Sequence, residues 1–161
     1  MTATVGATEV EERIVEREHL MLRAGIAMLE SAIDDASRLT RPELAQRVAR
    51  TTAWLHREVL PHAAWEEAFL YPQADRATGS PWTTRGLRFQ HEQIRELAGA
   101  LERTSVVAHE HWTPEIMYAL VAAMARLDAL LSAHLAQEEL SILPLLDDDV
   151  AVRQATEPTR G

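Results

Sequence analysis

Residues 62–67 read HAAWEE and residues 134–139 read HLAQEE, so each stretch places a histidine four positions before a glutamate. Four residues advance an α-helix by slightly more than one turn, which brings the two side chains onto one face. Val59 and Phe69 flank the first pair on its face, and Leu131 flanks the second. Because the inward faces of helices are normally apolar, these polar pairs predict a buried polar site between helices.

The two stretches belong to an internal repeat with a period of 72 residues. His62 and His134 are 72 positions apart, and so are His19 and His91, each of which precedes an arginine by four positions. One shift superimposes His19, Arg23, His62, Glu66, Glu67 and Pro72 on His91, Arg95, His134, Glu138, Glu139 and Pro144. The repeat predicts two helical hairpins related by a pseudo-two-fold axis, each supplying one lone histidine and one histidine–glutamate pair.

Four long segments with apolar residues at helical spacing lie between residues 8 and 146. Helix-breaking clusters separate them at about residues 38–40, 72–81 and 109–113. The chain has only 6 glycines and 7 prolines, and no stretch shows the alternation of a strand. The sequence therefore predicts an all-α fold, an up-down-up-down antiparallel four-helix bundle with the polar site in its core.

Local signals refine the second and fourth segments. Thr40 and Thr113 each precede an early proline, a pattern typical of a helix start. Pro61 lies inside the second segment, where its ring and its missing N–H predict a kink or a short interruption. Tyr71 follows His62 by nine positions, so an ideal helix places it on the side opposite the polar site.

Length, charge and cysteine content exclude several classes of function. The chain has 161 residues, which is the size of one domain, and its formal net charge is −9. Phosphate backbones and anionic membrane surfaces repel such an acidic protein, so we expect neither nucleic acid nor a membrane as partner. The absence of cysteine excludes disulfides, thiolate metal sites and a cysteine nucleophile.

The sequence also carries expectations about location and domain limits. The first residues lack the basic and apolar regions of a signal peptide, and no apolar run approaches the ~20 residues of a membrane span. We therefore expect a cytoplasmic protein. A single domain is predicted over residues 1–161, with the bundle at about 8–146 and a polar tail at 147–161; its oligomeric state stays open.

Six polar residues that the repeat brings together form a predicted set of metal ligands. They are His19, His62, Glu66, His91, His134 and Glu138. Imidazole and carboxylate together suit Fe, Mn or Zn, and carboxylates from opposite helices are placed to bridge two ions. A lone histidine on a helix is weak evidence for ligation. Two matched pairs with two further histidines at one common spacing predict a site for two first-row metal ions.

Four further residues lie near the predicted ligands in the sequence. Glu16 is three positions before the first histidine of the set and Glu58 is four before the second, so each is a candidate replacement ligand. A solvated helix face is the simpler interpretation of both. Arg23 and Arg95 fall on the ligand side by periodicity, where they either bond a carboxylate beside the metal pair or extend to solvent.

The combined motif resembles the hemerythrin-like proteins, the HHE cation-binding domain family. The resemblance rests on residues 61–72, PHAAWEEAFLYP, and residues 134–144, HLAQEELSILP, and covers roughly residues 10–146. It implies a four-helix bundle that holds two iron ions in an oxo- or hydroxo-bridged di-iron centre. The ligands carried over by position are the same six residues, with Glu66 and Glu138 bridging the irons.

Two positions depart from the respiratory hemerythrins. Their third helix has His-x-x-x-His, where this chain has Arg95 in place of the second histidine. Their fourth helix has an Asp five positions after its histidine, where this chain has Glu138 at four and Glu139 at five. We assign the ligand to Glu138, because it matches Glu66 under the repeat, and expect Glu139 and Glu67 nearer solvent. The missing fifth histidine argues against reversible oxygen carriage.

These observations predict a non-haem di-iron protein that binds or reacts with O2, peroxide or nitric oxide in sensing, storage or detoxification. Whether it turns over a substrate as an enzyme stays open. One alternative is an iron-handling or structural metal-binding bundle without redox turnover. Another is a helical interaction module in which the histidines are incidental. Metal analysis separates the last hypothesis from the others, and the optical band of an oxo-bridged ferric pair separates the first two.

Overall fold

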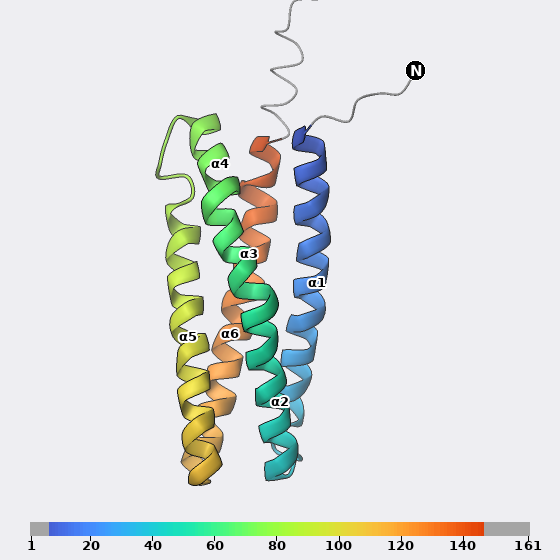
Figure 1. Cartoon of the computed structure of the whole chain (residues 1–161), viewed down its shortest axis with the longest axis vertical. Helices are drawn as coiled ribbons and strands as arrows, with labels where there is room; N and C mark the ends of the chain where they lie inside the picture. Colours follow the sequence, from blue (N-terminus) through green and yellow to red (C-terminus); the bar gives the residue numbers. More distant parts are fainter. Residues whose placement is uncertain (1–6, 147–161) are drawn as a thin grey trace, which may run out of the picture.

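The computed structural model describes residues 7–146, with side chains described from residue 17 onward. Four antiparallel helical rods lie side by side (Figure 1). They are α1 (Ala7–Asp35), a composite second rod, α5 (Arg85–Glu110) and α6 (Pro114–Ser141). No strand occurs within residues 7–146, which confirms the predicted all-α, up-down-up-down four-helix bundle. The tail predicted at 147–161 lies outside the described residues.

The second rod is a continuous run of α-helical segments and two π-helical turns. It consists of α2 (Arg41–Trp54), η1 (Leu55–Val59), α3 (Leu60–Trp65), η2 (Glu66–Leu70) and α4 (Tyr71–Thr78). Each π turn ends two residues before a proline, at Pro61 and Pro72. A proline ring clashes with the carbonyl four residues earlier, and the wider π turn relieves that conflict. The interruption predicted at Pro61 is therefore a π turn, and a second one precedes Pro72.

The second π turn changes which residues of this rod face the core. A π turn takes up one additional residue, so the residues within it fall progressively behind an ideal α-helix, and those beyond it lag by about 100°. Phe69, predicted to flank the polar site, is 57% exposed, and Tyr71, predicted to lie on the opposite side, is fully buried. Both predictions were wrong for one reason, because they assumed an uninterrupted α-helix.

The predicted helix starts at Thr40 and Thr113 are confirmed. The Glu43 carboxylate accepts a hydrogen bond of 2.8 Å from the Thr40 backbone N–H before α2. The Thr113 hydroxyl accepts one of 3.3 Å from the Ile116 N–H before α6. At the other end of the second rod, Gly79 caps α4 with a φ of 67°, the left-handed conformation that glycine adopts without strain.

The core has two apolar clusters, and the predicted ligands lie between them along the bundle. Val59 and Leu131 belong to the larger cluster, one turn before the histidine–glutamate pairs. Leu70 and Ile142 belong to the smaller cluster, one turn after them. The polar site is thus enclosed by apolar layers on both sides.

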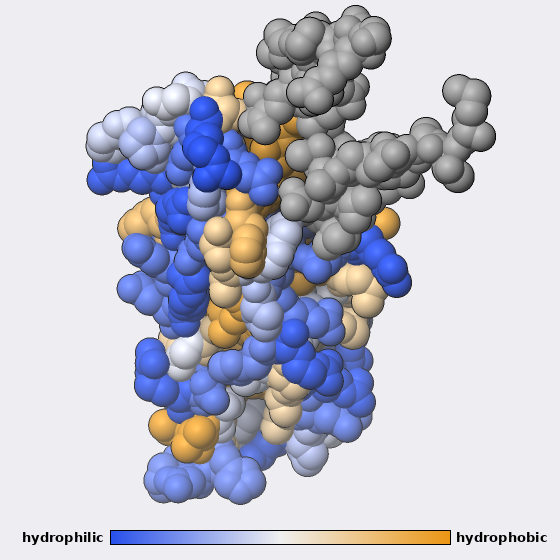
Figure 2. Space-filling model, turned by 45° about the horizontal axis from the view of Figure 1, so that its top comes forward, coloured by the Kyte–Doolittle hydropathy of each residue, from blue (hydrophilic) through white to orange (hydrophobic). Residues whose placement is uncertain are grey.

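Most side chains on the face of the molecule shown in Figure 2 are hydrophilic, with apolar ones in small groups.

The segment Pro114–Leu146 is long and apolar enough, by length and composition alone, to cross a membrane. The expectation that no apolar run approaches such a length was therefore wrong. A core helix of a bundle meets the same criterion. In this structure α6 packs against both α5 and α1, and its buried side carries His134 and Glu138.

Candidate metal centre

The structure brings all six predicted ligands together in the bundle core, where each residue is at most 7% exposed. They come from four rods: His19 from α1, His62 and Glu66 from the second rod, His91 from α5, and His134 and Glu138 from α6. Their ligand atoms form two groups, each spanning no more than 4.8 Å. We call the first group, His19, His62, Glu66 and Glu138, half-site A. Half-site B consists of Glu66, His91, His134 and Glu138.

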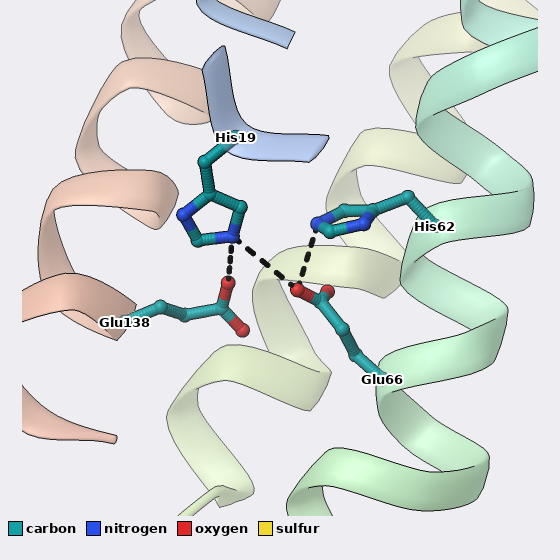
Figure 3. A group of neighbouring side chains, drawn as sticks. All are labelled: His19, His62, Glu66 and Glu138. Carbon is teal, nitrogen blue, oxygen red and sulfur yellow. Dashed lines mark ion pairs between the residues drawn. The ribbon is translucent and has the colours of Figure 1, made fainter. Parts of the chain in front are cut away.

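In half-site A, the imidazoles of His19 and His62 turn toward the carboxylates of Glu66 and Glu138 (Figure 3). His62 Nε2 lies 2.7 Å from Glu66 Oε1. His19 Nε2 lies 3.7 Å from the same oxygen and 3.4 Å from Glu138 Oε2. Two nitrogens and two oxygens from three rods therefore converge on one point.

Half-site B repeats this arrangement with the other oxygen of Glu66. His91 Nε2 lies 3.2 Å from Glu66 Oε2, and His134 Nε2 lies 3.9 Å from it. His134 Nε2 is also 3.6 Å from Glu138 Oε2, the oxygen that faces half-site A as well. Glu66 thus presents one oxygen to each half-site, which is the placement expected of a carboxylate that bridges two ions.

Several buried atoms at the centre lack a hydrogen-bond partner among the described residues. They are His19 Nε2, His62 Nε2, both carboxylate oxygens of Glu66, and Glu138 Oε2. These atoms lie close to one another, yet their contacts lack hydrogen-bond geometry. A buried polar atom without a partner costs about 1–3 kcal/mol. Cations bound to all of them would remove that cost, so the donor set fits first-row metal ions such as Fe, Mn or Zn.

The second ring nitrogen of every histidine contacts an oxygen just outside the half-sites. The pairs are His19 Nδ1–Glu139 Oε1 at 3.3 Å, His62 Nδ1–Glu18 Oε2 at 2.8 Å, His91 Nδ1–Glu67 Oε1 at 2.9 Å and His134 Nδ1–Gln90 Oε1 at 2.9 Å. An Nδ1–H that donates to such an oxygen fixes the tautomer and leaves the Nε2 lone pair free. All four imidazoles are thereby oriented to bind metal.

The match to a known family agrees with this geometry. The family model for the hemerythrin HHE cation binding domain matches residues 11–154. The chain belongs to the hemerythrin HHE cation-binding family. No curated protein and no solved structure matches it. The protein is therefore a hemerythrin-like cation-binding domain with buried histidine and glutamate metal-binding groups.

The two arginines of this hemerythrin-like repeat bond carboxylates beside the centre. Arg23 donates to Glu139 Oε2 at 2.6 Å, and Arg95 donates to Glu67 Oε1 at 2.8 Å. Of the two predicted outcomes for these arginines, a bond to a carboxylate beside the centre is thus the one observed. Glu67 and Glu139 remain partly exposed, as expected of residues nearer solvent, and neither belongs to a half-site.

The two candidate replacement ligands have different outcomes. Glu58 joins neither half-site within the described side chains; its carboxylate lies 3.9 Å from the Arg57 guanidinium and is 37% exposed. It therefore lies partly exposed at the wall of a cavity beside His62, outside both groups of ligand atoms. The Glu16 side chain lies outside the described part of the chain, so its role as a ligand stays a hypothesis.

Tyr71 is a buried residue of the centre that the sequence analysis missed. Its hydroxyl donates a hydrogen bond to Glu138 Oε1 and lies 3.3 Å from His91 Nε2. Its ring stacks on the His91 imidazole, with 5.4 Å between ring centroids. Burial, and then the charge of Glu138, raises the pKa of this phenol, so it stays protonated as a donor. The proline that follows it, Pro72, was the available sign of a π turn.

Without a bound ion, the carboxylates of the centre favour protons on the imidazoles of His19 and His62. Burial opposes a charge on His19, but the carboxylates of Glu138 and Glu66 outweigh it and raise its pKa to about 10. The pKa of His62 is also raised, because Glu66 and Glu18 outweigh its burial. Burial alone would raise the pKa of Glu66, yet the surrounding imidazoles hold it well below its ordinary value.

Proposed function

We propose that the protein is a non-haem di-iron protein that binds or reacts with O2, peroxide or nitric oxide, in sensing, storage or detoxification. The observation that carries this proposal is the placement of Glu66, which turns Oε1 to one pair of imidazoles and Oε2 to the other. His19, His62, Glu66, His91, His134 and Glu138 would hold the two ions. Iron bound there would supply a redox-active centre with affinity for small oxidants.

The donor count supports an open position at each ion. Each half-site offers two imidazoles and two shared carboxylates. Sites with two histidines, a carboxylate and open positions are typical of non-haem iron that reacts with oxygen. Arg95 occupies the place of a fifth histidine but bonds Glu67, so it brings no nitrogen ligand to half-site B. The chain thus leaves room for an exogenous molecule.

A cavity beside half-site A supports access by small molecules. It has a volume of about 360 Å³, and its walls include Glu18, Met21, Leu22, Pro61, His62 and Trp65. His62 is the most exposed of the six ligand residues, at 7%. A small molecule that enters this cavity reaches the edge of that imidazole, so we infer that small ligands approach the centre from this side.

The chain's own residues also support reaction over clean release of oxygen. Tyr71 holds Glu138 in place through a hydrogen bond at the centre, and its raised pKa keeps its hydroxyl protonated. The apolar clusters on both sides exclude bulk water. With four imidazoles and two shared carboxylates in all, the donor set has fewer nitrogens than that of an oxygen carrier, and oxygen donors favour the ferric state.

Iron content and an absorption spectrum test the proposal. Protein purified without added metal is expected to contain two irons per chain and to show the band of a bridged ferric pair. Anaerobic reduction should bleach this band, and oxygen should restore it irreversibly. Full recovery of the ferrous form when oxygen is removed would contradict the proposal. Two zinc ions in the natively purified protein would favour the alternative, a structural metal-binding bundle without redox turnover.

A further inference from the structure

The residues that contact Nδ1 of the four histidines follow the 72-residue repeat, but in one pair the two residues differ in charge. Glu139 behind His19 corresponds to Glu67 behind His91, and both are carboxylates. The other two histidines are held by residues 18 and 90, which are also 72 positions apart. Residue 18 is a glutamate, whereas residue 90 is a glutamine. Half-site A therefore has two carboxylates behind its imidazoles, and half-site B has one carboxylate and one amide.

We propose that this difference makes the two metal positions unequal, so that half-site A binds its ion more tightly and half-site B holds the more exchangeable ion. The inference rests on the proposed function, since it requires a centre that takes two ions. Glu18 and Gln90 are positioning residues in this scheme. They contact the imidazoles of His62 and His134 and act on the ions only through them.

The physical basis is the charge of the acceptor on each Nδ1–H. A carboxylate that accepts this hydrogen bond makes the imidazole a stronger donor at Nε2, and a neutral amide does so less. The two contacts have nearly the same length, 2.8 Å from His62 to Glu18 and 2.9 Å from His134 to Gln90. The half-sites thus differ here in charge, with little difference in geometry.

The neutral partner is itself held in place. The Gln90 amide nitrogen donates to Gln137 Oε1 at 3.0 Å, which leaves its oxygen directed at His134. The residue that corresponds to Gln137 under the repeat is Trp65. A pair of glutamines thus stands where the other half of the repeat has a glutamate and a tryptophan. The second glutamine, Gln137, holds the Gln90 amide in its orientation toward His134.

A second asymmetry lies on the same side of the centre. Tyr71 corresponds under the repeat to Leu143, which has no polar atom in its side chain. The Tyr71 hydroxyl donates to Glu138 and also lies 3.3 Å from Nε2 of His91, a nitrogen of half-site B. The phenol has a single proton, which Glu138 accepts, so the hydroxyl cannot also donate to His91 Nε2. Its oxygen lies beside a ligand nitrogen of half-site B, at a place where the other half of the repeat has only an apolar side chain.

Metal titrations of charge-swap variants test the inference. We would titrate metal-free protein with Zn²⁺ against a competing chelator at pH 7, in the wild type, Glu18→Gln, Gln90→Glu and the double swap. Glu18→Gln is expected to weaken the tighter step about tenfold, and Gln90→Glu to tighten the weaker step by a similar factor. Glu92→Gln is a matched control, because Glu92 is exposed and lies next to His91 as Glu18 lies next to His19.

Single-ion variants identify which half-site each step reports, since repulsion between two bound cations also separates the steps. His134→Ala removes a ligand of half-site B, and His62→Ala removes one of half-site A. Folded His134→Ala is expected to retain its one ion about tenfold more tightly than folded His62→Ala, with folding checked by circular dichroism. Addition of Glu18→Gln should weaken binding in His134→Ala and leave His62→Ala unchanged.

Two results separate a failure of this inference from a failure of the proposed function. The first result is that the wild type binds two ions, but the single-ion variants bind with equal affinity and Glu18→Gln has no more effect than Glu92→Gln. This result would overturn the inference alone. Failure of the wild type to bind two ions would overturn the proposed function, and the inference with it.

Discussion

The Tyr71 hydroxyl donates a hydrogen bond across the bundle to the carboxylate of Glu138, a residue 67 positions later in the chain. This bond fixes one oxygen of Glu138 and leaves the other, Oε2, to face both half-sites. Glu66 differs, because each of its oxygens faces a different half-site. The two shared carboxylates therefore have different freedom within one pseudo-symmetric centre, and Tyr71 causes the difference.

Replacement of Tyr71 by phenylalanine should destabilise the metal-free protein by about 1–3 kcal/mol, since Glu138 Oε1 would lose its donor in a buried setting. Urea unfolding of metal-free protein measures this loss. Tyr118→Phe is the matched control, because Tyr118 is 74% exposed and should give no change. Equal stability of Tyr71→Phe and the wild type would show that the bond contributes nothing net.

The sequence predicted which six polar residues meet in the core because the histidine–glutamate pairs repeat at one spacing. The pairs His62–Glu66 and His134–Glu138 each lie within a helical turn, so their relative placement depended only on local geometry. Tyr71 and Phe69 were misplaced because a π turn intervenes, and its register shift depends on how Pro72 is accommodated. A helical wheel drawn for an unbroken α-helix does not include this register shift.

The partners of the outer residues were less predictable. Arg23 and Arg95 were placed on the ligand side, but their bonds to Glu139 and Glu67 join residues more than 25 positions apart. Such contacts depend on how two rods pack and on which rotamers the neighbours leave free. The helical periodicity therefore allowed two outcomes for each arginine, a bond to a carboxylate or extension to solvent, and could not decide between them.

Removal of metal should lower the melting temperature, because the ligand atoms of the centre are buried and several lack partners. A ligand present at a hundredfold its dissociation constant stabilises the folded state by about 2.7 kcal/mol, which corresponds to about 5–10 °C in a chain of this size. Calorimetry before and after chelation measures the shift. Glu66→Ala and Glu138→Ala should each reduce the metal bound. A melting temperature that chelation leaves unchanged would mean that the ions contribute nothing to folding.

Metal loading should release protons and should weaken as the pH falls. In the metal-free protein the pKa of His19 is about 10, so its imidazole is charged at pH 7 and must lose a proton before Nε2 binds metal. For one such proton, apparent affinity changes up to about tenfold per pH unit below that pKa. Competition titrations at pH 6, 7 and 8 measure the slope. An affinity that does not vary with pH would contradict protonation of His19.

Asp128→Asn should raise stability at neutral pH. Burial, and then the charges of Glu30 and Asp34, raises the pKa of Asp128 in the folded protein, and its Oδ1 is a buried atom without a hydrogen-bond partner among the described residues. A raised acid pKa means that the folded state loses stability as the pH rises through that value. The gain in melting temperature should therefore be largest at pH 7 and should shrink toward pH 4. A gain that is constant with pH would point to packing rather than charge.

Obstruction of the cavity beside His62 should slow the entry of small ligands without loss of metal. Met21 lines this cavity and is 60% exposed, so a bulkier side chain there can cover the opening with little strain in the core. Met21→Trp is expected to reduce the association rate of azide with the ferric protein several-fold in stopped-flow absorption. Met28→Trp provides the control, because Met28 is similarly exposed on α1 but does not line the cavity. Equal rates in both variants, at equal iron content, would place the route of entry elsewhere in the bundle.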